Sequence, residues 1–125
     1  MKMTDIRSEI LKPRETPREK VTLEDGVELW VYGMTGGQAA QHQSYVLSDK
    51  GQINRSRLMR QDALLVVLTA RDESGAALFT RDDIDDLLNL PATYLKPALD
   101  AANRLSGLRT VDDMVKNSDA TDTDD

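Results

Sequence analysis

The only histidine, His42, is the first residue to test for chemistry, because an imidazole readily moves protons or binds a metal near neutral pH. No nucleophile and no second metal ligand lies near it, in the segment AAQHQS, at a spacing that would complete such a site. The segment RDDIDDL contributes four carboxylates: Asp82, Asp83, Asp85 and Asp86. They lack the D-x-D-x-D-G spacing and the closing glutamate of a calcium loop. We therefore expect a surface or half-packed His42, an acidic helix start, and no catalytic, cofactor or metal site.

Two further groups of residues could contact phosphate. Three glycines lie close together in the chain: Gly33, Gly36 and Gly37. They have neither the spacing nor the trailing Lys-Ser/Thr of a phosphate-binding loop. Three arginines form a basic stretch on the polar part of the helix predicted at residues 54–71: Arg55, Arg57 and Arg60. In a chain with a net charge of −6, we expect them to form a solvated or ion-paired helix face.

The composition narrows the class of protein. The net charge of −6 argues against a nucleic-acid binder, which normally presents a basic surface. The chain has no cysteine, so disulfides and thiolate metal sites are excluded. Its longest apolar run, residues 63–68, is too short to cross a bilayer, and the first residues lack the apolar stretch of a signal peptide. We expect a protein of a reducing cytoplasm that binds neither nucleic acid nor membrane.

Residues 21–31 predict a β-hairpin. Five apolar residues alternate with polar ones on the two sides of the segment EDG: Val21, Leu23, Val27, Leu29 and Val31. A two-residue turn would divide these apolar residues between the two faces of the hairpin. A three-residue loop with Gly26 in the left-handed region pairs Leu23 with Val27 and Val21 with Leu29, which gives one apolar face. We predict this second register, and we expect helices to cover the apolar face.

Three helices are predicted after the hairpin. The first begins at Thr35, which can cap it, and ends before the turn at residues 49–51. The second, at residues 54–71, contains the run ALLVVL and is therefore expected to be the central buried helix. After a turn at residues 72–75 and an extended stretch at 76–79, the third begins at Thr80. Three apolar residues of this third helix are expected to face the core: Ile84, Leu87 and Leu88.

The rest of the chain predicts a fourth helix and a short fifth. Pro91 is well placed as the first residue of the fourth helix, which runs toward Leu105. Pro97 lies inside this helix, so we expect a kink or a restart there. Gly107 is a natural left-handed stop, and Thr110 can open the last short helix.

The fold class that follows is mainly α with an N-terminal β-hairpin (α+β), with about four to five helices packed on the hairpin. We divide the chain into a flexible N-terminal segment at residues 1–19, one helical domain with its hairpin at 20–117, and a disordered acidic tail at 118–125. The N-terminal segment has three large apolar residues that could form a helical turn: Ile6, Ile10 and Leu11.

One arrangement of segments is more specific than any single motif. A buried helix (LLVVLTARD) is followed by a Gly turn, by LFT opening an acidic helix, and by an Ala/Leu helix that closes in AANRLSGL. This order resembles the tail assembly chaperones of long-tailed bacteriophages, over about residues 20–117. The matching residues are Asp72, Gly75, Leu78, Phe79, Thr80 and Asp83, then Arg104, Leu105, Gly107 and Leu108. The chain departs from the family at MTGGQ, where a Leu-Thr-x-x-Glu-like helix start is usual, and at Pro97.

The resemblance implies a function that the composition could not indicate. Proteins of this family bind the long, apolar tape measure protein, keep it soluble and help to gather tail tube subunits around it, and they are absent from the finished particle. A longer form is often made by ribosomal frameshifting, and the acidic segment 118–125 is consistent with such a junction. We therefore expect the tape measure protein as partner in the host cell cytoplasm, with no cofactor and no enzymatic activity. The tail tube protein and self-association stay open as further partners.

Two other classes of function are weighed against this one. A structural tail completion or connector protein would be retained in the virion, whereas a small helical DNA-binding regulator would need a basic recognition helix that the chain lacks. For the chaperone, we predict that Trp30 and Tyr32 contribute to the partner-binding surface, because the hairpin register turns both away from the core face. The alternative is that the N-terminal segment covers them.

Overall fold

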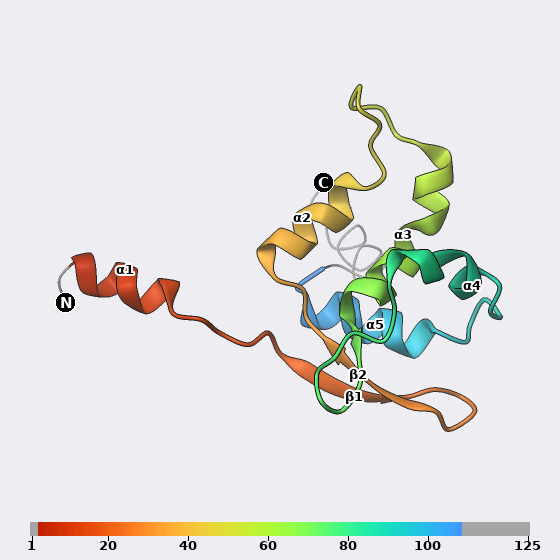
Figure 1. Cartoon of the computed structure of the whole chain (residues 1–125), viewed down its shortest axis with the longest axis horizontal. Coiled ribbons are helices and arrows are strands. Elements are labelled where there is room, and N and C mark those ends of the chain that lie inside the picture. The colour runs from red at the N-terminus through yellow and green to blue at the C-terminus, as the bar shows by residue number, and fades with distance from the viewer. Residues whose placement is uncertain (1–2, 109–125) are drawn as a thin grey trace, which may run out of the picture.

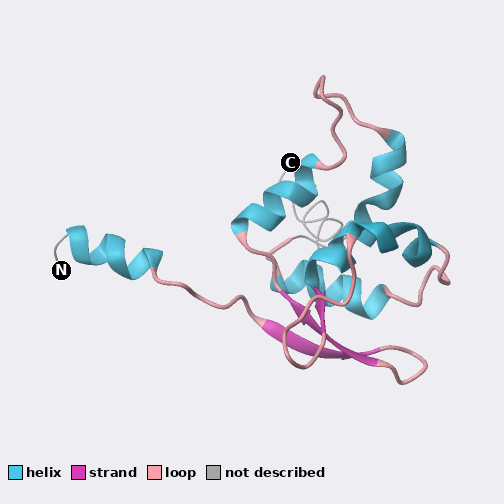
Figure 2. Ribbon diagram, in the orientation of Figure 1, coloured by secondary structure: helices cyan, strands magenta, loops and turns pink. Residues whose placement is uncertain are grey.

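The computed structural model describes residues 3–108, with the side chains of residues 5–108, as an α+β domain with a helical arm (Figures 1 and 2). Helices gather on one side of a three-stranded antiparallel sheet, which has the strand order β1-β2-β3. The strands are β1 (Arg18–Thr22), β2 (Glu28–Tyr32) and β3 (Ala70–Arg71). The described helices are α1 (Met3–Leu11), α2 (Gly36–Ser44), α3 (Arg55–Thr69), α4 (Ile84–Leu88) and α5 (Lys96–Leu105), with a 3₁₀ turn η1 (Arg81–Asp83) before α4. None of these helices is long and apolar enough to cross a membrane.

The predicted hairpin register is confirmed. Val21 pairs with Leu29, and the Leu23 N–H donates to the Val27 carbonyl at 2.8 Å. Gly26 has φ of +89°, as a three-residue loop of this type requires. The expected apolar face is present except at Val27, which is 51% exposed because the loop extends past the helices. Strand β1 also begins at Arg18, two residues earlier than the N-terminal boundary drawn from the sequence.

Helix α3 is the centre of the core, as its apolar run predicted. Residues 63–67 are all buried, and Leu64 is fully covered. Helices α2, α4 and α5 pack against α3, and α5 also packs on β1 and β2. The end of α3 differs from the prediction of a helix through residue 71. Ala70 and Arg71 leave the helix and pair with Val31 and Trp30 as the short strand β3. This pairing satisfies backbone N–H and C=O groups of β2, which would stay unpaired at the sheet edge if α3 continued for another turn.

The segment after α3 contains three further differences from the prediction. The first turn after Thr80 is a 3₁₀ turn, stabilised by the Asp83 carboxylate, which accepts from the Thr80 N–H at 2.8 Å. Leu88, the last residue of α4, is 44% exposed, whereas Ile84 and Leu87 are buried as expected. Pro91 does not begin a helix: residues 92–95 form turns, and α5 begins at Lys96 with Pro97 in its first turn. Pro97 therefore marks a restart, since a proline is tolerated where its missing N–H has no partner to lose.

The two ends of the described chain can be compared with the sequence predictions. Gly107 has φ of +74° and ends α5 as predicted, with the Leu108 N–H donating to the Asn103 carbonyl at 2.8 Å. The predicted helix at Thr110 and the acidic tail at residues 118–125 lie outside the described residues. At the other end, α1 is a nine-residue helix rather than a single turn, and it projects away from the domain on an extended linker (Figure 1).

Candidate partner-binding face at Trp30 and Tyr32

Strand β2 places Trp30 and Tyr32 on the sheet face that α5 does not cover. Side chains alternate along a strand, so Leu29 and Val31 enter the core while Trp30 and Tyr32 point the other way. Both aromatic rings are half-buried. The orientation predicted from the hairpin register is therefore present.

The N-terminal helix does not cover these rings, in contrast to the alternative considered above. Its apolar residues Ile6, Ile10 and Leu11 are exposed. Two arginines cover the rings instead. The guanidinium carbon of Arg18 lies 4.7 Å from the Trp30 ring centroid, and that of Arg71 lies 5.0 Å from the Tyr32 centroid. Such cation–π contacts hold a positive charge over an aromatic face.

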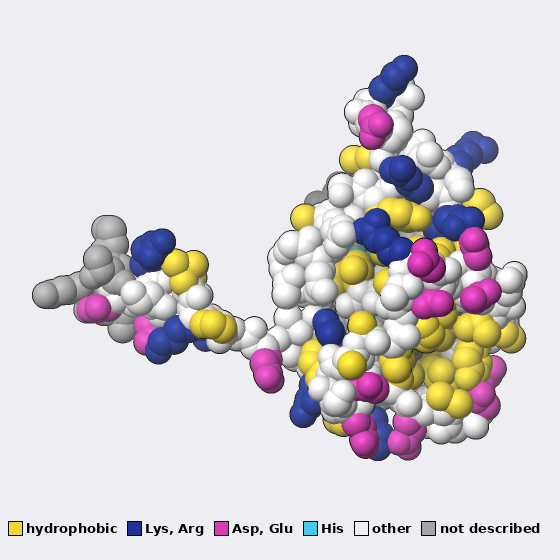
Figure 3. Space-filling model, viewed as in Figure 1, with side chains coloured by type: hydrophobic (Ala, Val, Ile, Leu, Met, Phe, Trp, Pro, Cys, Tyr) yellow, Lys and Arg dark blue, Asp and Glu magenta, His cyan; other side chains and the backbone are white. Residues whose placement is uncertain are grey.

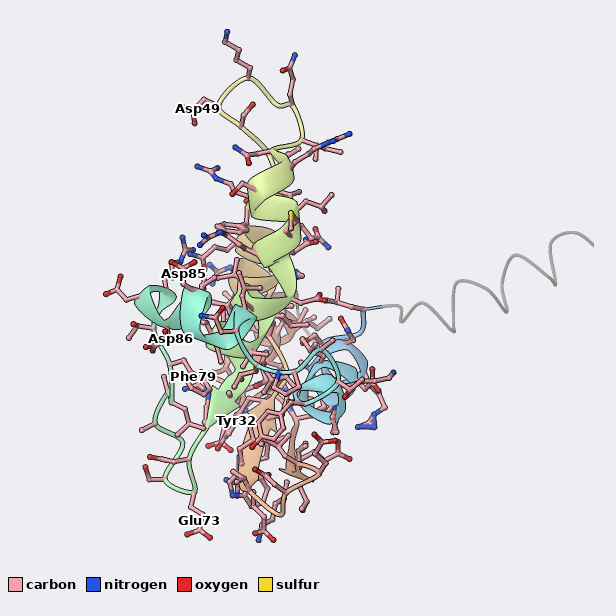
Figure 4. The ribbon with its side chains drawn as sticks, turned by 90° about the vertical axis from the view of Figure 1, so that its right-hand side faces the viewer. Tyr32, Asp49, Glu73, Phe79, Asp85 and Asp86 are labelled. Atoms are coloured by element: carbon pink, nitrogen blue, oxygen red, sulfur yellow. The ribbon has the colours of Figure 1, made fainter. Side chains whose placement is uncertain are left out.

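The loop after β3 closes the other side of this face. The Asp72 carboxylate accepts from the Ser74 hydroxyl at 2.6 Å and from the Ala76 N–H at 3.0 Å, and the Ser74 hydrogen bond lowers the pKa of Asp72. Gly75 has φ of +88° and lies against the Tyr32 hydroxyl, 3.4 Å from the position a Cβ would take. Arg71 donates to the Gly75 carbonyl at 3.0 Å, so the loop is held on the aromatic pair. Figure 4 shows Glu73 at the outer end of this loop.

The strand and the loop border an open cavity of about 480 Å³, which we call the Trp30 cavity. Trp30 and Leu78 provide its apolar side chains, Leu29 contributes to the lining although its side chain enters the core, and the remaining lining residues are polar or charged. On the rim, Lys20 and Glu28 form an ion pair at 2.8 Å, and hydrogen bonding to Glu28 raises the pKa of Lys20. An apolar wall with a charged rim suits recognition of a protein surface better than catalysis.

The indole N–H of Trp30 is a polar group that the fold does not satisfy. Its Nε1 atom is buried and has no hydrogen-bond partner in the described part of the chain. Leaving a buried donor unpaired costs about 1–3 kcal/mol.

His42 is more buried than the sequence indicated. It is 7% exposed on the inner side of α2, and neither ring nitrogen has a hydrogen-bond partner within the described chain. Burial lowers the pKa of His42, while the neighbouring Asp62 opposes that shift. The expectation of a surface or half-packed histidine is therefore wrong in its degree of burial, because α2 packs against α3 and Gln61 of α3 donates to the His42 carbonyl at 3.3 Å.

The aspartate and arginine groups behave as a charged helix surface. Asp85 forms an ion pair with Arg60 at 2.7 Å, and Figure 4 shows Asp85 and Asp86 on α4. Arg57 donates to the Leu47 carbonyl at 3.0 Å and lies 5.8 Å from the Tyr45 ring centroid. In the described residues, no group of three or more His, Cys, Asp or Glu side chains could hold a metal ion.

A second surface, which the sequence pattern did not predict, is a groove between α3, the 88–92 segment and α5, which we call the α3–α5 groove. Its volume is about 180 Å³, and nearly all of its lining is apolar. Met59 and Leu88 are 78% and 44% exposed on its walls. No signal in the sequence indicated this groove, because the apolar spacing of residues 84–88 predicted that Leu88 would face the core.

Comparison with solved structures relates this fold to a known one. The structure of the bacteriophage HK97 tail assembly chaperone aligns with 76% of this chain and 96% of its own length, at a TM-score of 0.50 and 19% sequence identity. The chain shares its fold with a phage tail assembly chaperone. This likeness supports, at the level of the fold, the resemblance drawn from the D-x-x-G-x-x-L-F-T segment. No protein-family model matches the sequence, and no curated protein matches it at a significant level.

Proposed function

We propose that this protein is a phage tail assembly chaperone. The observation that carries the proposal is the shared fold with the HK97 protein, which extends over nearly the whole of that chain. The independent resemblance in the segment from Asp72 to Asp83 supports the same assignment. In this role the protein acts in the host cell cytoplasm, binds the tape measure protein, assists the addition of tail tube subunits without catalysis, and is absent from the finished virion.

We further propose that the client binds at the Trp30 cavity. A client that is apolar and helical needs apolar surface that the core of its chaperone has not consumed. Trp30 and Leu78 provide such surface, with Leu78 42% exposed, and Tyr32 lies beside them under Arg71. The charged rim keeps the free protein soluble, and the net charge of −6 acts in the same direction for the complex.

Co-expression with the tape measure protein of the same phage tests the proposal. We expect the wild-type chain to move most of the tape measure protein from the insoluble to the soluble fraction, and Leu78→Asp to lose this effect at least tenfold. Val27→Asp is the matched control, because Val27 is 51% exposed on the hairpin loop and does not line the cavity. Circular dichroism should show all three chains folded.

Three results would contradict the proposal at different levels. If the wild-type chain leaves the tape measure protein insoluble, the chaperone function is wrong. If the protein is a stoichiometric component of purified virions, the tail completion or connector function replaces it. If Leu78→Asp and Val27→Asp behave alike, the client binds elsewhere on the domain.

A further inference from the structure

Residues 46–54, between α2 and α3, form a small hairpin that stands away from the rest of the domain (Figure 1). The Asn54 N–H donates to the Val46 carbonyl at 2.6 Å, and the Ser48 N–H donates to the Gln52 carbonyl at 2.7 Å. We call this hairpin the 46–54 finger. Its order comes from these backbone hydrogen bonds rather than from burial in the core.

The finger exposes two aliphatic side chains that face each other. Leu47 and Ile53 are directly opposite in an antiparallel bridge. The hydrogen-bonded pairs lie on either side of them, so these two residues form a non-hydrogen-bonded pair, in which side chains approach most closely. Leu47 is 39% exposed and Ile53 is 66% exposed. The pair therefore offers apolar surface that the core of the domain does not use.

Positive charges without ion-pair partners surround this aliphatic pair. The guanidinium carbons of Arg57 and Arg81 lie 5.8 and 5.9 Å from the centroid of one ring, that of Tyr45 at the base of the finger. Arg57 also donates to the Leu47 carbonyl at 3.0 Å, which places its charge beside the pair. Four cationic residues of this region are exposed and form no ion pair with a described residue: Lys50, Arg55, Arg57 and Arg81.

The surroundings of the finger distinguish between the anionic partners that could bind it. In Figure 3, Lys and Arg side chains gather toward the finger, and Asp and Glu side chains follow on the surface next to them. Asp49 at the tip and Asp82, which follows Arg81, are exposed. In a chain with a net charge of −6, these carboxylates repel an extended polyanion such as duplex DNA or an anionic membrane surface. A short acidic segment can contact the cations alone, and its apolar side chains can cover Leu47 and Ile53.

We infer that the 46–54 finger binds an acidic amphipathic segment of another protein. Apolar side chains of that segment cover Leu47 and Ile53, and its carboxylates pair with the surrounding cations. Figure 4 shows Asp49 of the finger at the opposite end of the domain from Tyr32. One chain can therefore hold a second protein while its client occupies the Trp30 cavity. The inference does not depend on the proposed client site, because the two surfaces share no residue.

Fluorescence anisotropy with a labelled acidic peptide tests the inference on the full-length protein. The probe has about 18 residues, enough for about five helical turns, with leucines at i, i+3, i+4 and i+7 and glutamates elsewhere. We expect a Kd of about 10–100 µM in about 50 mM salt. Binding should weaken by about fivefold or more in about 0.5 M salt, because salt screens exposed charges. The same peptide with lysine in place of glutamate should bind about tenfold more weakly or not at all.

Two variants separate the apolar and the charged parts of the contact. Ile53→Ser removes exposed apolar surface, Arg55→Gln removes an exposed charge, and each should weaken peptide binding by about threefold or more. Val27→Ser, at a residue 51% exposed on the other hairpin, and Lys96→Gln on α5 are the matched controls and should bind like wild type. Wild-type affinity in either finger variant overturns the inference. Loss of binding in Leu78→Asp, with binding kept in Ile53→Ser, would place the peptide in the Trp30 cavity and also overturn it.

An environment-sensitive dye locates the bound peptide, because the chain has no native cysteine. With the dye at Gln52→Cys on the finger, its emission should shift to the blue when the peptide is added, whereas at Glu24→Cys in the loop between β1 and β2 it should not. A shift at Glu24→Cys alone, or at neither position, overturns the inference. Vesicles with about 30% phosphatidylserine and a duplex DNA of about 20 base pairs are titrated in parallel. Tighter binding of either than of the acidic peptide would identify a membrane or a nucleic acid as the partner and overturn the inference.

Discussion

Replacing Gly33 with alanine tests the junction on which both surfaces depend. Gly33 follows β2 and lies where the end of the sheet meets the end of α5. A Cβ added there would be 2.5 Å from the Leu105 carbonyl oxygen, 3.1 Å from the Leu105 carbonyl carbon and 3.4 Å from Pro17 Cδ. The closest two atoms belong to the backbone of α5, so they cannot move away by a change of rotamer.

The magnitude follows from what must shift. To admit the methyl group, the end of α5 has to separate from β2, which also weakens the 2.8 Å bond from the Gly33 N–H to Pro17 and the 2.9 Å bond from the Met34 N–H to Ser106. Overpacking of this kind typically costs about 1–3 kcal/mol. For a domain of this size, about 5 °C of Tm corresponds to each kcal/mol, so we expect Gly33→Ala to lower the Tm by about 5–15 °C.

The assay is thermal unfolding followed by circular dichroism, with Gly37→Ala as the control. Gly37 lies in the first turn of α2, and the nearest atom to its added Cβ, Thr35 Oγ1, is 4.0 Å away. Alanine is favoured over glycine in a helix by up to about 1 kcal/mol, so this variant should melt at the wild-type temperature or a few degrees higher. The two glycines therefore predict effects of opposite sign. Equal Tm values for the two variants would refute the contact between β2 and α5.

Three further predictions concern single sites. Burial lowers the pKa of His42 below 6.5 in the folded chain, so the imidazole of the unfolded chain is protonated at a higher pH than that of the folded chain. The free energy of unfolding should therefore fall as the pH drops through 6.5 toward the folded pKa. Urea midpoints at about pH 7.5 and about pH 5.5 should differ less in His42→Leu than in wild type; equal differences would contradict this. Trp30→Ala should remain folded by circular dichroism, with a loss below the about 3–5 kcal/mol of a fully buried aromatic residue, and should fail to keep the tape measure protein soluble; an unfolded variant, or one that retains the client, would exclude Trp30 as a client contact. Truncation after Asn117 should leave the Tm nearly unchanged, because residues 118–125 contain no large apolar side chain, and a fall of more than about 5 °C would show that they dock.

The features that sequence reasoning predicted correctly are those determined by neighbouring residues. The hairpin register depends on the spacing of its apolar residues around Gly26, and the start of α2 depends on a Thr35 hydroxyl that accepts from the Gln38 N–H at 3.2 Å. The features it missed depend on contacts between distant segments. Ala70 and Arg71 read as the end of a helix until β2 is available to pair with them. His42 has no local sign of burial, because its cover comes from α3.

The candidate partner-binding face likewise has features that could be predicted from neighbouring residues and features that could not. The side of the sheet on which Trp30 and Tyr32 lie follows from the period of two along a strand, and this much was predictable. Their cover was not. Arg18 precedes Trp30 by twelve positions and Arg71 follows Tyr32 by thirty-nine, so neither cation–π contact leaves a local pattern in the sequence.

The segment from Asp72 to Asp83, which suggested the resemblance, is mostly accounted for by folding alone. Asp72 accepts the hydrogen bonds that shape its turn, Gly75 provides a positive φ beside Tyr32, and Asp83 caps the 3₁₀ turn. These residues therefore indicate a fold, and their presence alone does not establish that a client binds. Leu78 is different, because it is apolar, 42% exposed and part of the wall of the Trp30 cavity. Its side chain is not needed to hold the turn, so its replacement separates the shared fold from the proposed function.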